Sequence, residues 1–121
     1  MPTFLSQLPS DLQSVIKAVN KLVSIGNNSS TIETVSDKLF LLSEVEIFGS
    51  TSQSFAGEGS QYAWYKAGNT KIKKVNGSMY DWWERSPRRN STNAFCRVDR
   101  NGDTNYYSAS DSSGVSFGFC V

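Results

Sequence analysis

Histidine is absent from this 121-residue sequence, and cysteine occurs only twice, at positions 96 and 120. Without histidine the chain lacks the commonest general base, the usual switch near neutral pH and the commonest zinc ligand. Cys96 and Cys120 lie too far apart for a C-x-x-C redox pair, and the sequence leaves open whether they form a disulfide. Glycine-rich phosphate-binding loops are missing too. We therefore expect no catalytic residues, no metal and no cofactor.

An excess of either charge is missing as well, since 12 lysines and arginines stand against 11 acidic residues. Nucleic-acid binding needs a clustered positive field, and the only basic cluster, at residues 66–74, alternates with Ile72 and Val75 like a solvated strand edge. The longest apolar run, residues 39–42, is far too short to span a bilayer, and the N-terminus shows no signal peptide. We expect neither nucleic-acid binding nor membrane insertion.

The remaining composition indicates one folded domain over residues 1–121, because 38 % of the residues are hydrophobic. Met1-Pro2 is compatible with an expression start, so the domain can be the C-terminal part of a longer natural chain. Within it, residues 10–25 predict the one amphipathic helix, since apolar residues recur at three-and-four spacing. Ser10 and Gln13 have the spacing of a capping box, and Gly26 supplies a left-handed stop.

A strand at residues 38–42 is predicted to lead into a short helix that ends at Gly49. Ser43 and Glu46 repeat the capping-box spacing. Glu44 and Glu46 could instead be a carboxylate pair for acid–base catalysis, but acids in a first helical turn are normally capping and dipole residues, which we favour. Downstream, the pattern predicts a loop at residues 50–60, an aromatic helix at 61–67 closed by Gly68, and a turn at Asn76-Gly77.

Three antiparallel strands are predicted near the C-terminus, at residues 95–98, 104–109 and 115–121. Their connections, residues 99–102 and 111–114, consist of turn-forming residues. Asp99, Asn101 and Asp103 begin like a calcium loop, but Thr104 replaces its glycine and no glutamate stands at the twelfth position. A hairpin turn explains these residues better than a calcium site.

The register of the first of these hairpins decides which side chains share a face. A three-residue loop with Gly102 in the left-handed conformation places Arg97 opposite Asn105, whereas a two-residue loop would align Arg97 with Tyr106. We favour the first register because it turns the smaller and more apolar set inward. One face then carries Arg97, Asp99, Asp103, Asn105 and Tyr107, and the other carries Cys96, Val98, Thr104 and Tyr106.

Several short sequences together carry a family resemblance: DKLFLLSE at 37–44, WWERSP at 82–87, FCRV at 95–98 with Asn101-Gly102, GV at 114–115 and GFCV at 118–121. This frame resembles an uncharacterised domain common in gut bacteria and their phages. Its members look like C-type lectin folds related to formylglycine-generating enzymes. The resemblance implies an α+β, C-type lectin-like fold with one amphipathic N-terminal helix, short helices and a small antiparallel sheet that includes a C-terminal three-strand meander.

Some proteins of this kind resemble the variable proteins of diversity-generating retroelements, whose C-terminal segment is mutated at adenines to diversify ligand binding. Mutated AAC codons yield Asn, Ser, Thr, Tyr, Asp, Arg and Gly, which are the residue types crowded into residues 88–113. The same types suit a paratope, although Asn, Ser and Asp are also ordinary turn formers. Turn chemistry leaves Arg97, Asn105 and Tyr107 unexplained at strand positions, so we favour a binding face.

The resemblance is incomplete in two respects. The Glu-Pro-Asn and Trp-Asn-Asp motifs of sugar-binding lectins are missing, so calcium-dependent sugar binding is not implied. The closely spaced catalytic cysteines of formylglycine-generating enzymes are missing too, so their oxidase activity is not implied.

The sequence therefore predicts a non-enzymatic ligand-binding module of the phage tail or receptor-binding type, located on a virion tail or a bacterial cell surface. Its partner for host attachment would be a cell-surface protein or a glycan, and a homo-oligomer within a larger assembly fits this role. The predicted core support is Trp82, Trp83, Phe117 and Phe119. The predicted binding face is Arg88, Arg89, Asn93, Arg97, Asp99, Arg100, Asp103, Asn105, Tyr107, Asp111 and Ser113. The alternative is a structural virion or cell-surface assembly module without a dedicated ligand site.

Overall fold

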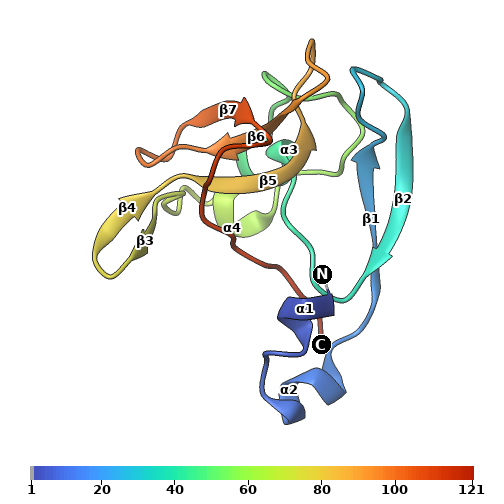
Figure 1. Cartoon of the computed structure of the whole chain (residues 1–121), viewed down its shortest axis with the longest axis vertical. Coiled ribbons are helices and arrows are strands. Elements are labelled where there is room, and N and C mark those ends of the chain that lie inside the picture. Colours follow the sequence, from blue (N-terminus) through green and yellow to red (C-terminus); the bar gives the residue numbers. More distant parts are fainter. Residues whose placement is uncertain (1) are drawn as a thin grey trace.

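The chain is an α+β protein with short helices and small antiparallel sheets, as predicted. The computed structural model describes residues 2–121, with side chains from Phe4 onward. In chain order the elements are α1 (Pro2–Leu5), α2 (Ser10–Val15), β1 (Val19–Ser24), β2 (Ile32–Asp37), α3 (Glu44–Phe48), α4 (Ala63–Lys66), β3 (Lys73–Val75), β4 (Ser78–Tyr80), β5 (Trp82–Pro87), β6 (Ala94–Val98) and β7 (Thr104–Ser108), shown in Figure 1. Within residues 2–121 no helix is long and apolar enough to cross a membrane.

The predicted helix over residues 10–25 is wrong beyond Val15. Helix α2 ends there, and from Val19 the chain is extended as β1, which pairs antiparallel with β2 from Val19 opposite Asp37 to Ser24 opposite Ile32. In β1 the more buried side chains alternate, so the period is two rather than 3.6. Valine is β-branched and favours strands, and β2 supplies a hydrogen-bonding partner that the local pattern could not reveal.

Helix α3 forms as predicted, and its capping box is complete. The Ser43 hydroxyl accepts from the backbone N–H of Glu46 at 3.3 Å, while the Glu46 carboxylate accepts from the N–H of Ser43 at 3.0 Å. Gly49 ends the helix with a φ of 72°. The strand predicted just before it, at residues 38–42, is not formed. Phe40 instead makes an isolated bridge to Gly118.

The largest sheet has the strand order β5-β6-β7. Its β6–β7 register is the predicted one, with Arg97 opposite Asn105 and Gly102 at a φ of 85°. The third predicted strand, residues 115–121, is wrong: the third strand of this sheet is β5, which pairs with β6, and no strand within residues 2–121 pairs with the other side of β7. Figure 1 shows the C-terminal segment passing β5 and descending towards α1. It forms only isolated bridges, from Gly114 to Trp82, Gly118 to Phe40 and Cys120 to Lys17.

Two of these three bridges are at glycines, because the C-terminal backbone passes very close to its neighbours at Gly114 and Gly118. A Cβ at Gly114 would lie 3.1 Å from the carbonyl oxygen of Asp81, and one at Gly118 would lie 2.5 Å from the Phe40 ring. Side chains at these two positions would force the segment away from its neighbours. The tail therefore joins the sheet to the N-terminal part of the chain instead of extending the meander.

The core lies between the inner face of the β5-β6-β7 sheet and the helices α3 and α4. Ile47, Tyr65, Trp82 and Val98 form its buried cluster. The prediction of Trp82 as core is therefore confirmed, whereas Trp83 is only half-buried. Phe119 was predicted to support the core but is 44 % exposed, because it belongs to the C-terminal tail and not to a sheet strand. Phe117 packs against Phe4, with 4.8 Å between ring centroids.

Candidate functional site

One side of the β5-β6-β7 sheet faces away from the core, and we call it the outer face. Direct strand partners project to the same side of a sheet. Trp83 is opposite Arg97, which is opposite Asn105, and Phe95 is opposite Tyr107. These five residues define the outer face, whereas Cys96 and Val98 turn to the core with no exposed surface.

Arg97 lies at the centre of the outer face but is mostly covered, with 11 % of its side chain exposed. Its guanidinium lies 3.4 Å from the Asp81 carboxylate and donates to the Ser113 hydroxyl at 3.2 Å. The same group stacks over the Tyr107 ring at 4.4 Å. Arg97 therefore acts as a support that fixes Tyr107, which itself is 49 % exposed.

Arg88 supports the neighbouring tyrosine from the other side of β7. Its guanidinium carbon lies 4.2 Å from the centre of the Tyr106 ring, and it also donates to the carbonyl of Arg89. Tyr106 is 44 % exposed. Two adjacent tyrosines on opposite faces of one strand are thus each held by a stacked arginine.

A cavity of about 550 Å³ lies beside β7. Asn105 to Ser108 form one wall, and the segment before β6 forms the other. No charged side chain lines it. The lining residues are Ser91, Asn93, Ala94, Asn105, Tyr106, Tyr107 and Ser108.

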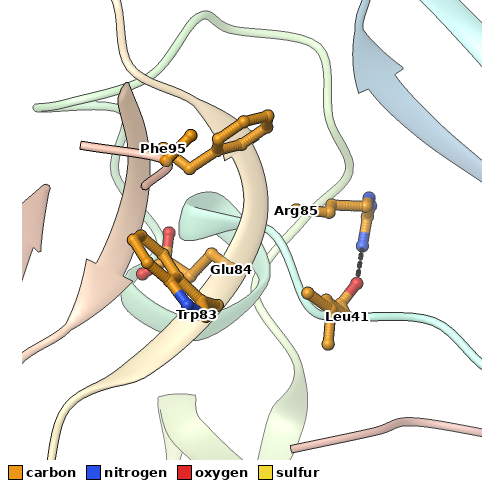
Figure 2. Close-up of a pocket in the computed structure, with 6 residues that line it drawn as sticks. Leu41, Trp83, Glu84, Arg85 and Phe95 are labelled. Atoms are coloured by element: carbon orange, nitrogen blue, oxygen red, sulfur yellow. Dashed lines mark hydrogen bonds between the residues drawn. The ribbon is translucent and has the colours of Figure 1, made fainter. Parts of the chain in front are cut away.

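A second cavity of about 400 Å³ lies over β5, between Trp83, Phe95, Leu41 and Ala109. Figure 2 shows the Arg85 side chain turned away from Trp83 and Phe95 towards Leu41, whose carbonyl accepts from it at 2.9 Å. Its charged end is therefore occupied, so mainly its apolar stem borders the cavity. Glu84 also borders this cavity, but the residue is only 1 % exposed.

The structure divides the eleven predicted site residues into three groups. Asn93, Asn105 and Tyr107 line the cavity beside β7. Arg88, Arg97 and Ser113 support the two tyrosines directly or through a hydrogen bond. The third group lies outside both cavity linings and comprises Arg89, Asp99, Arg100, Asp103 and Asp111.

Local hydrogen bonds account for several members of the third group. The Asp99 carboxylate accepts from the N–H groups of Asn101 and Asp103, each at 2.9 Å, and so closes the hairpin turn. The N–H of Arg100 donates to Asp81 at 2.8 Å. Arg89 donates through its backbone to the carbonyl of Gln53 at 2.8 Å. Asp99 and Arg100 therefore fix the turn of the β6–β7 hairpin, and Arg89 anchors the connection before β6 to the loop after α3.

Sequence reasoning missed Tyr106, Ser91 and Ser108 as cavity residues. It assigned Tyr106 to the inner face, which is correct by alternation, but β7 is an edge strand that extends past the core. The side chain therefore remains half-exposed although its neighbours Cys96 and Val98 are buried. No signal in the sequence indicated this, because residues 104–109 were predicted to lie between strands at 95–98 and 115–121.

The sequence also did not reveal that four glutamates are buried: Glu44, Glu46, Glu58 and Glu84. Glu46 forms ion pairs with Lys21 at 2.5 Å and Arg85 at 2.6 Å. Burial raises its pKa, but the hydrogen bonds from Arg85 and Lys21 outweigh burial and lower the pKa overall. Glu44 accepts from the loop after α3, including the N–H of Ser54 at 3.0 Å.

Glu84 differs from Glu46, because neither of its carboxylate oxygens has a hydrogen-bond partner among the described residues. Burial raises its pKa well above the ordinary range, and the nearby charges of Glu44 and Glu58 add to this rise. Burial likewise raises the pKa of Glu58, whose carboxylate accepts from the N–H of Ser24 at 2.9 Å. Within residues 2–121 no group of three or more acidic, cysteine or histidine side chains could hold a metal ion.

Comparison with known proteins gives one match. A family model described as "Domain of unknown function (DUF6273)" matches residues 2–121. No curated protein and no solved structure matches the chain.

Proposed function

We propose that this chain, which belongs to the DUF6273 family, is a non-enzymatic ligand-binding module whose ligand contacts the β7 edge and the outer face. The observation that carries the proposal is the uncharged cavity of about 550 Å³ beside β7. Tyr106 and Tyr107 border it, half-exposed and each held by a stacked arginine.

The lining chemistry supports recognition. Tyrosine gives a large, amphipathic contact area at a small cost in conformational entropy, and serine and asparagine give adaptable hydrogen bonds. The stacked arginines restrict the rings before a ligand arrives, which reduces the ordering cost of binding. Charged side chains are absent from the lining, so shape and neutral hydrogen bonds determine which ligand fits.

Two features of the buried glutamates support a non-enzymatic role. The carboxylate oxygens of Glu84 are buried, so they are not positioned to exchange protons with a ligand in either cavity. Glu44 and Glu46 are occupied by hydrogen bonds and ion pairs that join separate segments of the chain. These acids are suited to holding the fold rather than to general acid–base chemistry.

The proposal extends to a C-type lectin-like fold of the phage tail or receptor-binding type, with a diversified C-terminal face, on a virion tail or a bacterial surface. The residue types expected from mutated AAC codons support this extension, because Asn93, Asn105 and Tyr107 border the cavity without belonging to the core. A template repeat that differs only at adenines, close to a reverse transcriptase gene, is the expected finding in the coding DNA. Ordinary codon usage without such a repeat would remove the diversification.

An assembly module is the second candidate, and one observation favours it. Val75, Met79 and Tyr80 are 53 %, 44 % and 49 % exposed on the β3–β4 hairpin. Figure 1 shows this hairpin extending from the body of the protein. Exposed apolar groups gathered on one element are typical of interaction surfaces.

A matched pair of tyrosine variants tests the two candidates. Tyr107 and Tyr80 are both 49 % exposed and lie on different hairpins. Fluorescently labelled protein is added to a panel of gut bacterial isolates, and flow cytometry measures the bound protein. We expect Tyr107→Ser to weaken binding by about tenfold or more, whereas Tyr80→Ser binds like the wild type. Loss of binding only in Tyr80→Ser would favour the hairpin, and wild-type binding by Tyr107→Ser would contradict the proposal.

A further inference from the structure

The two edges of the β5-β6-β7 sheet differ in how they are covered. The β5 edge is partly closed by the chain itself, since Trp83 donates to the carbonyl of Gly114 at 3.0 Å and Gly114 donates to that of Asp81 at 2.7 Å. Arg85 likewise donates through its backbone to Leu42 at 2.9 Å. No strand within residues 2–121 pairs with the other edge, formed by β7.

The hydrogen-bond register shows which backbone groups point outward from β7. Asp99 donates to the carbonyl of Asp103, and Ala109 donates to that of Asn93, so the odd-numbered residues of this hairpin pair across it. Antiparallel strands alternate between bonded and non-bonded pairs. The N–H and C=O groups of Thr104, Tyr106 and Ser108 therefore point away from β6.

The uncharged cavity follows this edge. Four consecutive residues, 105–108, line it. Successive side chains of a strand point to opposite faces, so a cavity confined to one face would meet only alternate residues. A cavity that meets all four reaches beyond one face of β7 to the strand edge, where the outward backbone groups lie.

The edge is protected by two local hydrogen bonds. The Asn105 side chain accepts from the N–H of Tyr106 at 2.6 Å, and the N–H of Asp111 donates to the carbonyl of Ser108 at 3.0 Å. Unpaired edges invite pairing with other chains, and these two bonds occupy one N–H and one carbonyl that would otherwise be open to a partner. Rotation of one asparagine side chain would release the central N–H for a specific partner.

We propose that the ligand is an extended polypeptide segment with uncharged side chains, which adds to β7 as a fourth strand. Backbone hydrogen bonds to Tyr106 and Ser108 would hold it, while Tyr106 and Tyr107 would pack on its two faces. The lining itself carries no charged side chain, and the nearest charges are the arginines behind the two tyrosine rings, so a positively charged segment would lose hydration with no opposite charge to offset it. This inference rests on the proposed function and specifies its ligand.

Phage-displayed random dodecapeptides provide the probe, selected on the wild-type chain and then measured by fluorescence polarisation. Ser108→Pro removes one outward N–H, and proline is tolerated where the N–H of an edge strand faces solvent. Ser108→Ala is the matched control, because it removes the hydroxyl and keeps the N–H. We expect the proline variant to bind the peptide about tenfold or more weakly than the alanine variant, so that the difference between them reports the N–H alone.

A change in the peptide gives the same test without altering the protein. Two versions of a selected peptide are made, one N-methylated at its odd-numbered amides and one at its even-numbered amides. In an added strand only alternate amides face β7. We therefore expect one version to lose binding and the other to keep it. Strand addition would be overturned if the selection recovered no peptide above background. It would also be overturned if Ser108→Pro bound the peptide as tightly as Ser108→Ala and both methylated peptides still bound. If Tyr107→Ser still reduces binding to bacteria in that case, the proposed function stands and only the peptide ligand is wrong. Wild-type bacterial binding by Tyr107→Ser would mean that the proposed function itself fails.

Discussion

The buried ion-pair network around Glu46 and the outer face of the β5-β6-β7 sheet both carry polar residues, but these residues differ in what they contact. In the buried network, Glu46 joins Lys21 of β1 and Arg85 of β5 to the start of α3. On the outer side, Tyr107 rests on one arginine and is otherwise 49 % exposed. Polar composition alone therefore does not identify a binding surface. The useful distinction is between polar groups already occupied inside the fold and those left facing solvent.

The buried network gives the largest expected effect on stability. Arg85 donates to the carbonyls of Leu22, Leu41 and Glu58 at 2.9–3.0 Å, besides its ion pair with Glu46. Removing one partner of a buried ion pair leaves an uncompensated charge. We expect Arg85→Ala to lower the free energy of unfolding by about 3–5 kcal/mol.

Urea denaturation measures this change, and Arg89→Ala is its control. The Arg89 side chain makes one hydrogen bond at 3.3 Å, to the carbonyl of Ser52. Its loss should cost about 0.5 kcal/mol or less. Equal losses in the two variants would show that the buried network does not hold the fold.

The unpartnered carboxyl of Glu84 gives a pH-dependent effect. Its pKa is raised by burial in the folded protein, whereas the ordinary value is 4.5. At pH values between 4.5 and the raised pKa of the folded state, the folded protein binds more protons than the unfolded protein. Stability is therefore lost as the pH rises through this range. Glu84→Gln removes this loss. Its stability relative to wild type should increase above pH 4.5, by up to about 1.4 kcal/mol per pH unit.

Thermal or urea unfolding at several pH values between acid and mildly alkaline conditions checks the Glu84 prediction. Glu33→Gln, on an exposed position of β2, is the control and should follow the wild-type curve. A Glu84→Gln curve that runs parallel to wild type at all pH values would show that this carboxyl is not destabilised by burial.

Two arginines that pair with Asp81 allow a smaller effect to be measured. Arg97 is 11 % exposed and stacks on Tyr107, whereas Arg100 is 66 % exposed and lies 4.0 Å from the carboxylate. Arg97→Ala should lower the free energy of unfolding by about 1–2 kcal/mol and weaken ligand binding by freeing the Tyr107 ring. Arg100→Ala should change stability by about 0.5 kcal/mol or less. Similar values for both would mean that Arg97 does not support the outer face.

The two cysteines offer a test with no expected effect on stability. Cys120 is exposed, while Cys96 is fully buried, and burial with the nearby Glu84 raises the pKa of its thiol. Alkylation followed by mass spectrometry should therefore modify one thiol in the native protein and two in denaturant. Finding no modified thiol before reduction would reveal a disulfide and contradict the positions of these residues.

Local chemistry made part of this fold predictable. The capping box of Ser43 and Glu46, the Asn76-Gly77 turn and the Gly102 hairpin each depend on residues close together in sequence. Because the hairpin register followed from its turn, the common face of Arg97, Asn105 and Tyr107 could be predicted as well.

Contacts between residues far apart in the sequence determine the parts of the fold that the sequence did not predict. The Val19–Ser24 segment is compatible with a helix until β2 pairs with it, and residues 115–121 bridge to Phe40 and Lys17 instead of pairing with β7. The burial of Glu46 depends on Lys21 and Arg85, which lie 25 and 39 residues away. No local pattern announces such a network, and Arg97 was interpreted as a contact residue because its pairing with Asp81 was not visible in the sequence.

The most direct test of the account is a single saturation library, displayed on yeast and sorted for both protease resistance and binding to bacterial isolates. It covers Asn93, Tyr106 and Tyr107 of the cavity at β7, and Glu44, Glu46 and Arg85 of the buried network. We predict that most substitutions in the first group keep protease resistance but lose binding, whereas most in the second group lose protease resistance. Loss of protease resistance at Tyr106 and Tyr107 as severe as at Glu46 and Arg85 would contradict the separation of binding from folding.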